Sequence, residues 1–393
     1  MRIRSLLRRS PLLFSLLVCC ATAIAADSVS NPPPERDDGW RLGTLAEAGF
    51  DLDIMRDLDQ KLQKGQFTNV HMVAVEQGGK LVYEQYLSGI DQNWGTSLGH
   101  RKFDHDSLHD LRSISKSVTA ILLGMALGEE FEAVLDKPVI DYFPEYADDL
   151  APGAEQITVE HVLTMTSGLE WNEMDVSYSN PENDEIQLYY TSDPVRRVLS
   201  KPLVSEPGTA WYYSGGDTMI VAALVEKITG MPFLEFAHEN LFKPLNIPPK
   251  YIEWRGLGFW SAWPTLPSAA SGLRMRVRDL AKIGHLMLHE GRWQEQQIVP
   301  ASWVAASMQR HTEQTYDKWS RNGMFGYGYQ WWHGEFKADA GDFTAITGVG
   351  YGSQRLFVIP QRDLAITVFA GNYNQGPWRI STLVMLKVVG AAP

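Results

Sequence analysis

Apolar and polar residues alternate between Asn69 and Tyr86, on both sides of Gly78-Gly79. A period of two is typical of a strand with one buried face, and a glycine pair fits a tight turn. The pattern therefore predicts a β-hairpin close to the N-terminal end. Strand character returns near the C-terminus, in residues 326–334, 342–360 and 362–373.

Between these strands, apolar positions recur every three or four residues, which is typical of helices. The clearest case is residues 111–131, where Gly128 marks the expected end. Further helices are expected at 52–62, 158–168, 194–199, from Asp217 or Thr218 to Gly230, 271–291 and 378–388. The expected fold is therefore α+β: an antiparallel sheet built from N- and C-terminal segments and flanked by helices, with a mainly helical middle at about 135–270.

The first 25 residues have the features of a secretory signal peptide. Four arginines precede an apolar run from Leu12 to about Ala21, and Ala23-Ile24-Ala25 fits a cleavage site. The run is shorter than the roughly 20 residues that a membrane-spanning helix needs. We expect cleavage after Ala25, a linker at residues 26–45 and a catalytic domain at residues 46–390.

Cysteine usage agrees with export. Cys19 and Cys20 are the only cysteines, and both lie in the leader. Neither follows the small residue expected before a lipid-attachment cysteine, so a lipoprotein is disfavoured. Export without disulfides is typical of a bacterial periplasmic or secreted protein with a large core.

The charge balance limits the partners. The formal net charge is −12, and it becomes −16 when the four leader arginines are removed. An acidic chain without a basic stripe is a poor match for nucleic acid or an anionic membrane. We expect a small-molecule substrate, no nucleic-acid partner and no integral membrane segment after cleavage. The sequence leaves the oligomeric state open.

Ser113 and Lys116 stand three residues apart in the first turn of the helix expected at 111–131. Residues at this spacing share a helix face, so the hydroxyl and the amine can approach each other. A lysine whose pKa is lowered by burial and the helix dipole can take the serine proton. The same helix end favours an oxyanion. Serine is also common at ordinary helix starts, so the pair alone leaves both interpretations open.

Six segments, taken in order, resemble the serine β-lactamase-related hydrolases. This family includes class C β-lactamases, penicillin-binding carboxypeptidases, esterases and 6-aminohexanoate-oligomer hydrolases. The resemblance covers about residues 45–390 and implies a β-lactamase/transpeptidase-like fold. The segments are Ser113-Ile114-Ser115-Lys116, residues 135–146, 157–169, 207–214, 272–288 and 346–360.

The resemblance implies roles for individual residues. Ser113 would be the acylated nucleophile, Lys116 its proton partner, and Tyr213 a proton shuttle. A phenol with a pKa near 10 acts as a base only beside a cation, which Lys116 would supply. Tyr212 is the alternative tyrosine. The second oxyanion donor, beside the N–H of Ser113, would be a backbone N–H on the late strand, with Gly348 and Tyr351 as candidates.

Two positions depart from the family pattern. Gly215 stands where the family has an asparagine two residues after the tyrosine, and Ile346 stands where a lysine or histidine is usual. In penicillin-recognising members these residues bind the substrate amide and carboxylate, and here Arg355 is the candidate substitute cation. The departures favour the esterase and linear-amide branch. The segment from Tyr213 to Asp217 and the chain length favour the 6-aminohexanoate-dimer hydrolase branch.

An acidic loop at residues 172–185 shows no clear periodicity, and its length makes it a candidate pocket wall. Its aromatic side chains could line the pocket, and its carboxylates could bind a substrate ammonium. The alternative is that these acids are simply solvated. Besides Ile346, the candidate pocket residues here are Trp171, Glu170, Glu173, Asp175 and Tyr178.

The chain has no His-Glu-x-x-His, the zinc-binding motif of many metalloproteases. The histidines show no metal spacing, so His105 and His109 are expected at the surface, and no metal or cofactor is expected. The sequence thus predicts an exported serine hydrolase that cleaves a small ester or amide through an acyl-enzyme on Ser113. The alternatives are a β-lactamase or D-alanyl-D-alanine carboxypeptidase and a non-catalytic penicillin-binding-like sensor.

Overall fold

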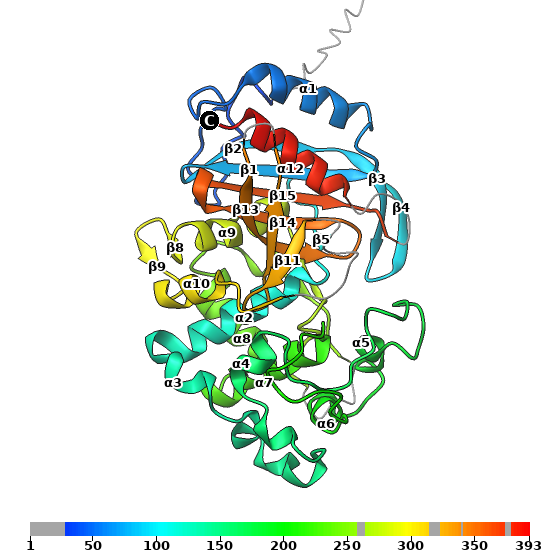
Figure 1. Cartoon of the computed structure of the whole chain (residues 1–393). Coiled ribbons are helices and arrows are strands. Elements are labelled where there is room, and N and C mark those ends of the chain that lie inside the picture. Colours follow the sequence, from blue (N-terminus) through cyan, green and yellow to red (C-terminus); the bar gives the residue numbers. More distant parts are fainter. Residues whose placement is uncertain (1–27, 258–263, 314–322, 339–340, 374–378) are drawn as a thin grey trace, which may run out of the picture.

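A computed structural model describes residues 28–257, 264–313, 323–338, 341–373 and 379–393. Its central feature is an eight-stranded sheet in which every neighbouring pair is antiparallel. Figure 1 shows the sheet in the upper half of the molecule. In spatial order, its strands are β10 (Thr312–Glu313), β11 (Met324–Tyr327), β12 (Trp332–Phe336), β13 (Phe343–Gly350), β14 (Gln354–Ile359), β15 (Leu364–Ala370), β1 (Val70–Gln77) and β2 (Lys80–Tyr86).

The predicted hairpin is present as β1 and β2. Gly78 and Gly79 form the turn with φ of +58° and +75°, a region that glycine enters at little cost. β1 pairs on its other side with β15, so the two ends of the domain share one sheet. This confirms the expected α+β class with a sheet from N- and C-terminal segments.

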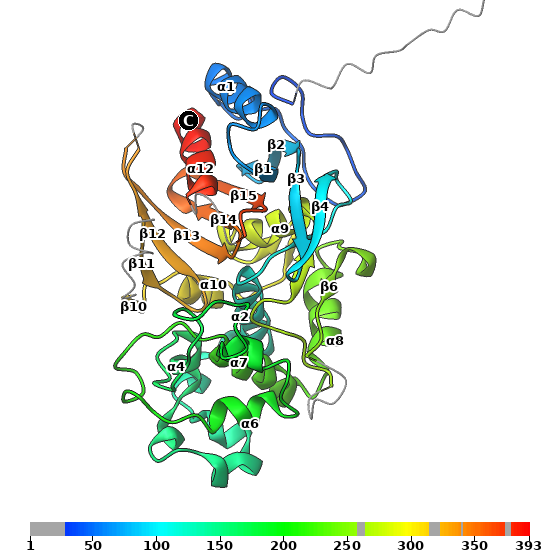
Figure 2. The ribbon, with the colours of Figure 1, turned by 90° about the vertical axis from the view of Figure 1, so that its right-hand side faces the viewer.

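Helices cover both faces of the sheet. Alternate residues of β1 point to opposite faces, so Val73 and Val75 pack in the cluster that contains α1 and α12. Met72 and Ala74 pack in the other cluster, with α2 and α9. Figure 2 shows the sheet between these two layers.

Below the sheet lies the helical region, where α2 packs against α7. The longer helices are α1 (Leu52–Gln63), α2 (Ile114–Leu127), α7 (Gly215–Thr229), α9 (Val277–Leu288) and α12 (Ile380–Ala391). The shorter helices are α3 (Glu132–Leu135), α4 (Val159–Leu163), α5 (Asp184–Gln187), α6 (Pro194–Leu199), α8 (Phe233–Ala237) and α10 (Ala301–Ser307).

Three small sheets complete the described part of the chain. One of them joins the segment before Ser113 to the segment before α9. They consist of β3 (Ser88–Asn93) with β4 (Thr96–Lys102), β5 (His109–Asp110) with β7 (Leu273–Met275) and β6 (Glu253–Trp254), and β8 (Arg292–Trp293) with β9 (Gln296–Gln297).

Two helix starts differ from the prediction. The helix expected from residue 271 begins at Val277, because residues 273–275 are used to pair with β5 and β6. The helix that ends at Gly230 begins one turn earlier than expected, since Ser214 is its N-cap and accepts a hydrogen bond from Asp217 N–H.

The segment expected as a linker packs against the domain over its described part. Val29, Trp40 and Leu45 are buried, and the Trp40 indole N–H donates to the Arg278 carbonyl oxygen at 3.2 Å. Arg278 in turn donates to the Pro34 carbonyl oxygen at 3.1 Å. Among the described residues, no helix has the length and apolar character needed to cross a membrane.

Candidate active site

Ser113 occupies the N-cap position of α2, directly after Arg112, whose φ is +51°. Its hydroxyl makes no capping hydrogen bond to its own helix, which leaves Oγ available for chemistry. Ser115 holds the turn instead: its Oγ donates to Arg112 O at 2.7 Å and accepts from Leu273 N–H at 3.1 Å. The serine therefore sits at the positive end of a buried 14-residue helix.

Lys116 lies one turn further, and its amine is almost fully buried. Its Nζ is 3.4 Å from Ser113 Oγ, 3.3 Å from the Ala270 carbonyl oxygen and 3.3 Å from Glu173 Oε1. Glu185 Oε2 lies 3.6 Å from the same nitrogen. The lysine thus joins the nucleophile to two buried carboxylates.

Tyr213 completes the predicted trio. It precedes the N-cap of α7, its ring is buried, and Lys116 Nζ lies 4.7 Å from the ring centroid. Tyr212, the alternative tyrosine, is 39% exposed. The structure therefore brings Ser113, Lys116 and Tyr213 together, from α2 and the start of α7.

Glu173 fills the space left by the missing asparagine. Its Oε2 accepts hydrogen bonds from Gly215 N–H at 2.6 Å and from the Trp171 indole at 2.9 Å, and its Oε1 accepts from the Tyr178 hydroxyl at 3.0 Å. A Cβ at position 215 would lie only 2.9 Å from Glu173 Oε2 and 3.2 Å from Glu185 Oε2. Glycine at this position is what makes room for the two carboxylates.

This arrangement contradicts the expected lowering of the lysine pKa. Burial acts to lower the pKa of Lys116, but the charges of Glu173 and then Tyr213 and Glu185 outweigh it, so the pKa is raised. Burial raises the pKa of Glu173 to about 8 against the opposing effect of Lys116. Burial also raises the pKa of Tyr213 to about 12, although Lys116 opposes this. The proton that leaves this cluster most easily is therefore the Glu173 proton.

A cavity of about 350 Å³ opens on Ser113. This volume is within the range of small-molecule sites. Four aromatic side chains, two cationic side chains and one carboxylate line the cavity. They are Trp94, Tyr178, Tyr189, Tyr351, Arg112, Arg255 and Glu185.

The candidate pocket residues separate into groups. Tyr178 lines the cavity, whereas Trp171 and Glu173 lie beneath it, where the indole holds the carboxylate. Glu173 pairs with Lys116, which contradicts its expected role as a receptor for a substrate ammonium. Asp175 is exposed on the loop. Ile346 lines a different cavity, beside Met308 and His333.

The two candidates for the second oxyanion donor lie in different surroundings. Tyr351 lines the cavity together with Ser113, whereas a Cβ at Gly348 would face Ile114 at 3.1 Å, inside the packing against α2. Tyr351 is the better placed of the two. Gly350, which the sequence did not single out, lies so close to the chain before Ser113 that a Cβ there would be 2.2 Å from the Leu111 carbonyl oxygen.

Arg355 does not replace the missing substrate-binding cation. It is 2% exposed, and its Nη1 donates to the carbonyl oxygens of Gly350 and Gln354 at 3.2 and 2.8 Å. Its guanidinium therefore supports the end of β13. The cations that line the cavity are Arg112 and Arg255.

Sequence reasoning missed Glu185. The residue lies at the end of the acidic loop, but Asn183 Oδ1 accepts hydrogen bonds from the N–H groups of Glu185 and Ile186 and starts α5 there. An asparagine followed by two acids is a recognisable N-cap signal. It could have placed Glu185 on a helix rather than in a loop.

The chain is similar to proteins of known family. The profile of the beta-lactamase family matches residues 56–379. The chain belongs to the beta-lactamase family. It is 26% identical over 361 residues to a 6-aminohexanoate-dimer hydrolase of Paenarthrobacter ureafaciens, covering 87% of this chain and 80% of that protein. It is 30% identical over 213 residues to esterase EstB of Burkholderia gladioli, covering 52% and 50%.

Solved structures share the fold. A structure titled "Putative 6-aminohexanoate-dimer hydrolase from Bacillus anthracis" superimposes with a TM-score of 0.60 at 20% identity, covering 84% of this chain and 81% of that one. EstCE1, titled a hydrolase with promiscuous acyltransferase activity, gives 0.64 at 18% identity, covering 88% and 98%. Both comparisons confirm the expected fold, and the two curated relatives of this beta-lactamase family member described above are a hydrolase and an esterase.

Substitution of Gly215 tests the packing around the two carboxylates. We expect Gly215→Ala to lower the free energy of unfolding by about 1–3 kcal/mol, because the new methyl group would overlap the Glu173 carboxylate. Denaturant unfolding would measure this. The matched control is Gly390→Ala in α12, where a Cβ meets nothing within 4 Å and no loss is expected. Equal stability of the two variants would contradict this prediction.

Proposed function

We propose that this beta-lactamase family member is an exported serine hydrolase that cleaves a small ester or linear amide through an acyl-enzyme on Ser113. The observation that supports this most is the position of Ser113 Oγ, 3.4 Å from Lys116 Nζ, which itself lies 4.7 Å from the centroid of the Tyr213 ring. The names of its relatives, a 6-aminohexanoate-dimer hydrolase and an esterase, favour the same branch.

In the proposed reaction, Ser113 Oγ attacks the substrate carbonyl carbon while its proton passes to Lys116 or Tyr213. The N–H of Ser113 and a backbone N–H at the end of β13 bind the oxyanion. Tyr213 returns the proton to the leaving oxygen or nitrogen. Water then attacks the acyl-enzyme, the same groups take its proton and return it to Ser113 Oγ as the C–Oγ bond breaks, and the acid is released.

The pocket favours a linear substrate. Glu173 occupies the space in which penicillin-recognising members have an asparagine, and Ile346 faces a different cavity. Arg112 and Arg255 remain as cations for a substrate carboxylate, and Arg255 is fixed over the Tyr189 ring at 4.5 Å from its centroid. The aromatic walls suit a methylene chain. These features support hydrolysis of a 6-aminohexanoate oligomer or a similar ester.

Incubation of the purified protein with three substrates tests the proposal. We expect turnover of p-nitrophenyl butyrate and of a 6-aminohexanoate dimer, slow or absent turnover of a chromogenic cephalosporin, and a covalent mass increase on Ser113. Ser113→Ala is the matched control and should lose turnover and adduct. Rapid cephalosporin hydrolysis would instead indicate a β-lactamase. An absence of Ser113-dependent reaction with all three would favour a non-catalytic sensor.

A further inference from the structure

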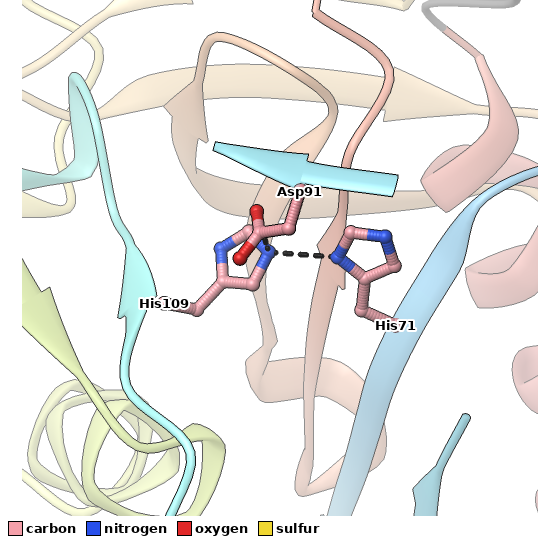
Figure 3. Close-up of side chains that lie close together, drawn as sticks. All are labelled: His71, Asp91 and His109. Atoms are coloured by element: carbon pink, nitrogen blue, oxygen red, sulfur yellow. Dashed lines mark hydrogen bonds and ion pairs between the residues drawn. The ribbon is translucent and has the colours of Figure 1, made fainter. Parts of the chain in front are cut away.

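A second cluster of polar side chains lies where an inner strand of the central sheet meets two of the small sheets, and none of its residues lines the Ser113 cavity. It consists of His71 on β1, Asp91 on β3 and His109 on β5, and all three side chains are buried (Figure 3). His71 Nδ1 is 2.9 Å from His109 Nε2, which is 3.5 Å from Asp91 Oδ1. The expectation that His109 lies at the surface is wrong, because β5 places it between the rings of Phe103 and Phe369.

The neighbours of His71 determine which of its nitrogens has the proton. Asn69 Oδ1 accepts from Ile90 N–H at 2.8 Å, and Asn69 Nδ2 donates to Ile90 O at 2.9 Å, so the amide orientation is fixed. His71 Nε2 lies 3.1 Å from the same Asn69 oxygen and must be the donor. In a neutral ring, Nδ1 is then an unprotonated acceptor.

The same reasoning applies to His109. Its Nδ1 lies 3.2 Å from the backbone carbonyl oxygen of Asp110, which can only accept a hydrogen bond. Nδ1 therefore has the proton, and Nε2 is an acceptor. Two acceptor nitrogens thus face each other at 2.9 Å, which is repulsive without a positive charge between them.

Asp91 adds a third acceptor. Among the described residues, neither of its carboxylate oxygens has a hydrogen-bond partner of good geometry. Asp91 Oδ2 forms an ion pair of 3.9 Å with Arg101 Nη1, whereas Oδ1 lies on the side of the histidines, 3.5 Å from His109 Nε2. Two nitrogen lone pairs and one carboxylate oxygen therefore converge on one buried point.

We propose that His71 Nδ1, His109 Nε2 and an Asp91 oxygen bind one divalent transition-metal ion, with Zn²⁺ as the first candidate. Imidazole and carboxylate donors suit zinc, whereas calcium and magnesium prefer an all-oxygen shell. Zinc–nitrogen bonds of about 2.0–2.1 Å place two ligand nitrogens roughly 2.9–3.4 Å apart at ordinary coordination angles. The hydrogen bonds from the opposite ring nitrogens to Asn69 and Asp110 match the outer-shell contacts of metal-binding histidines.

A second histidine cluster provides an internal contrast. Glu76 Oε1 lies 2.7 Å from His285 Nδ1 and 2.8 Å from His289 Nε2. Here a carboxylate meets two ring nitrogens that can each donate, so ordinary hydrogen bonds account for the geometry. The contact with Glu76 raises the pKa of His289, as expected for such a bond. This cluster needs no ion.

The proposed ion would have a structural role next to the active site. His109 stands four residues before Ser113, and Asp91 lies on the hairpin that continues to Trp94 in the cavity wall. Trp94 N–H already donates to Asp110 Oδ2 at 2.8 Å. An ion shared by β1, β3 and β5 would fix this wall relative to the sheet and to the segment that leads to Ser113.

Zinc binding to the full-length mature chain, purified without a histidine tag, tests this inference. We expect one Zn²⁺ per chain by elemental analysis and isothermal titration, and a higher Tm with Zn²⁺ than after chelation. Asp91→Asn keeps the size of the side chain but removes its charge, so affinity should fall at least ~100-fold. His289→Gln is the matched control from the other cluster and should keep the ion.

A crystal of the unsubstituted protein grown with Zn²⁺ gives a test that does not depend on variant folding. We expect an anomalous difference peak between His71, Asp91 and His109. A peak only at Glu76, loss of zinc in His289→Gln but not in Asp91→Asn, or no binding at tenfold excess of Zn²⁺ would each overturn the proposal.

Discussion

Replacing Lys116 with methionine should slow acylation of Ser113 by roughly 10³- to 10⁴-fold. The amine lies 3.4 Å from Ser113 Oγ and 4.7 Å from the centroid of the Tyr213 ring. Without it, the serine proton has no acceptor close in pKa. Burst release of p-nitrophenol and the covalent mass of the acyl-enzyme would measure the loss.

The substitution also leaves Glu173 and Glu185 buried without their cation, which is destabilising. The double variant Lys116→Met/Glu173→Gln separates the two effects, because it removes one of the unpaired carboxylates. We expect its Tm to recover relative to Lys116→Met while acylation stays slow. Recovery of both together would show that Lys116 acts only through stability.

Replacing Glu173 with glutamine should move the pH dependence of kcat/KM. In the resting cluster, Lys116 is an ammonium and Glu173 is a protonated acid. The reactive cluster has a neutral Lys116 and contains one proton fewer in total. In the unsubstituted protein that proton is lost near the Glu173 pKa of about 8, so kcat/KM should rise with pH through about 8. With glutamine, this acid is absent, and the proton must come from the lysine itself, whose ordinary pKa is about 10.4. The rise near pH 8 should therefore disappear, and kcat/KM should rise only at higher pH.

Asp175→Asn is the matched control for this experiment. It removes a carboxylate from the same loop, but one that is exposed and outside the Lys116 cluster. Its pH profile should overlay that of the unsubstituted protein. A profile for Glu173→Gln that also stays unchanged would mean that Glu173 only fills space behind Gly215.

Local patterns predicted the elements that depend on local physics. Alternation and a glycine pair were sufficient for β1 and β2, and a proline at the first helical position was sufficient for α6. The prediction failed at residues 271–276, where helical periodicity competes with pairing to β5 and β6. That pairing depends on partners about twenty and more than a hundred and fifty residues away, which no local window contains.

For the site too, the contacts within one helix could be predicted, and the contacts between distant segments could not. Ser113 and Lys116 share one helix, so their contact could be predicted from spacing alone. The partnership of Lys116 with Glu173 depends on a loop that folds back over Gly215, and its effect on the lysine pKa opposes the effect expected from burial. His109 was misplaced for the same reason, since its burial depends on strands from three separate parts of the chain.

The pairing of β1 with β15 also constrains the order in which the molecule can form. One long edge of β1 has no partner until residues 364–370 have been synthesised, long after residues 70–77 emerge from the ribosome. Contacts so distant in sequence form slowly, and an unpaired apolar strand edge invites association with other chains. Efficient production of this protein should therefore depend on how well the nascent hairpin is protected during synthesis, and we expect a holding chaperone to raise the soluble yield.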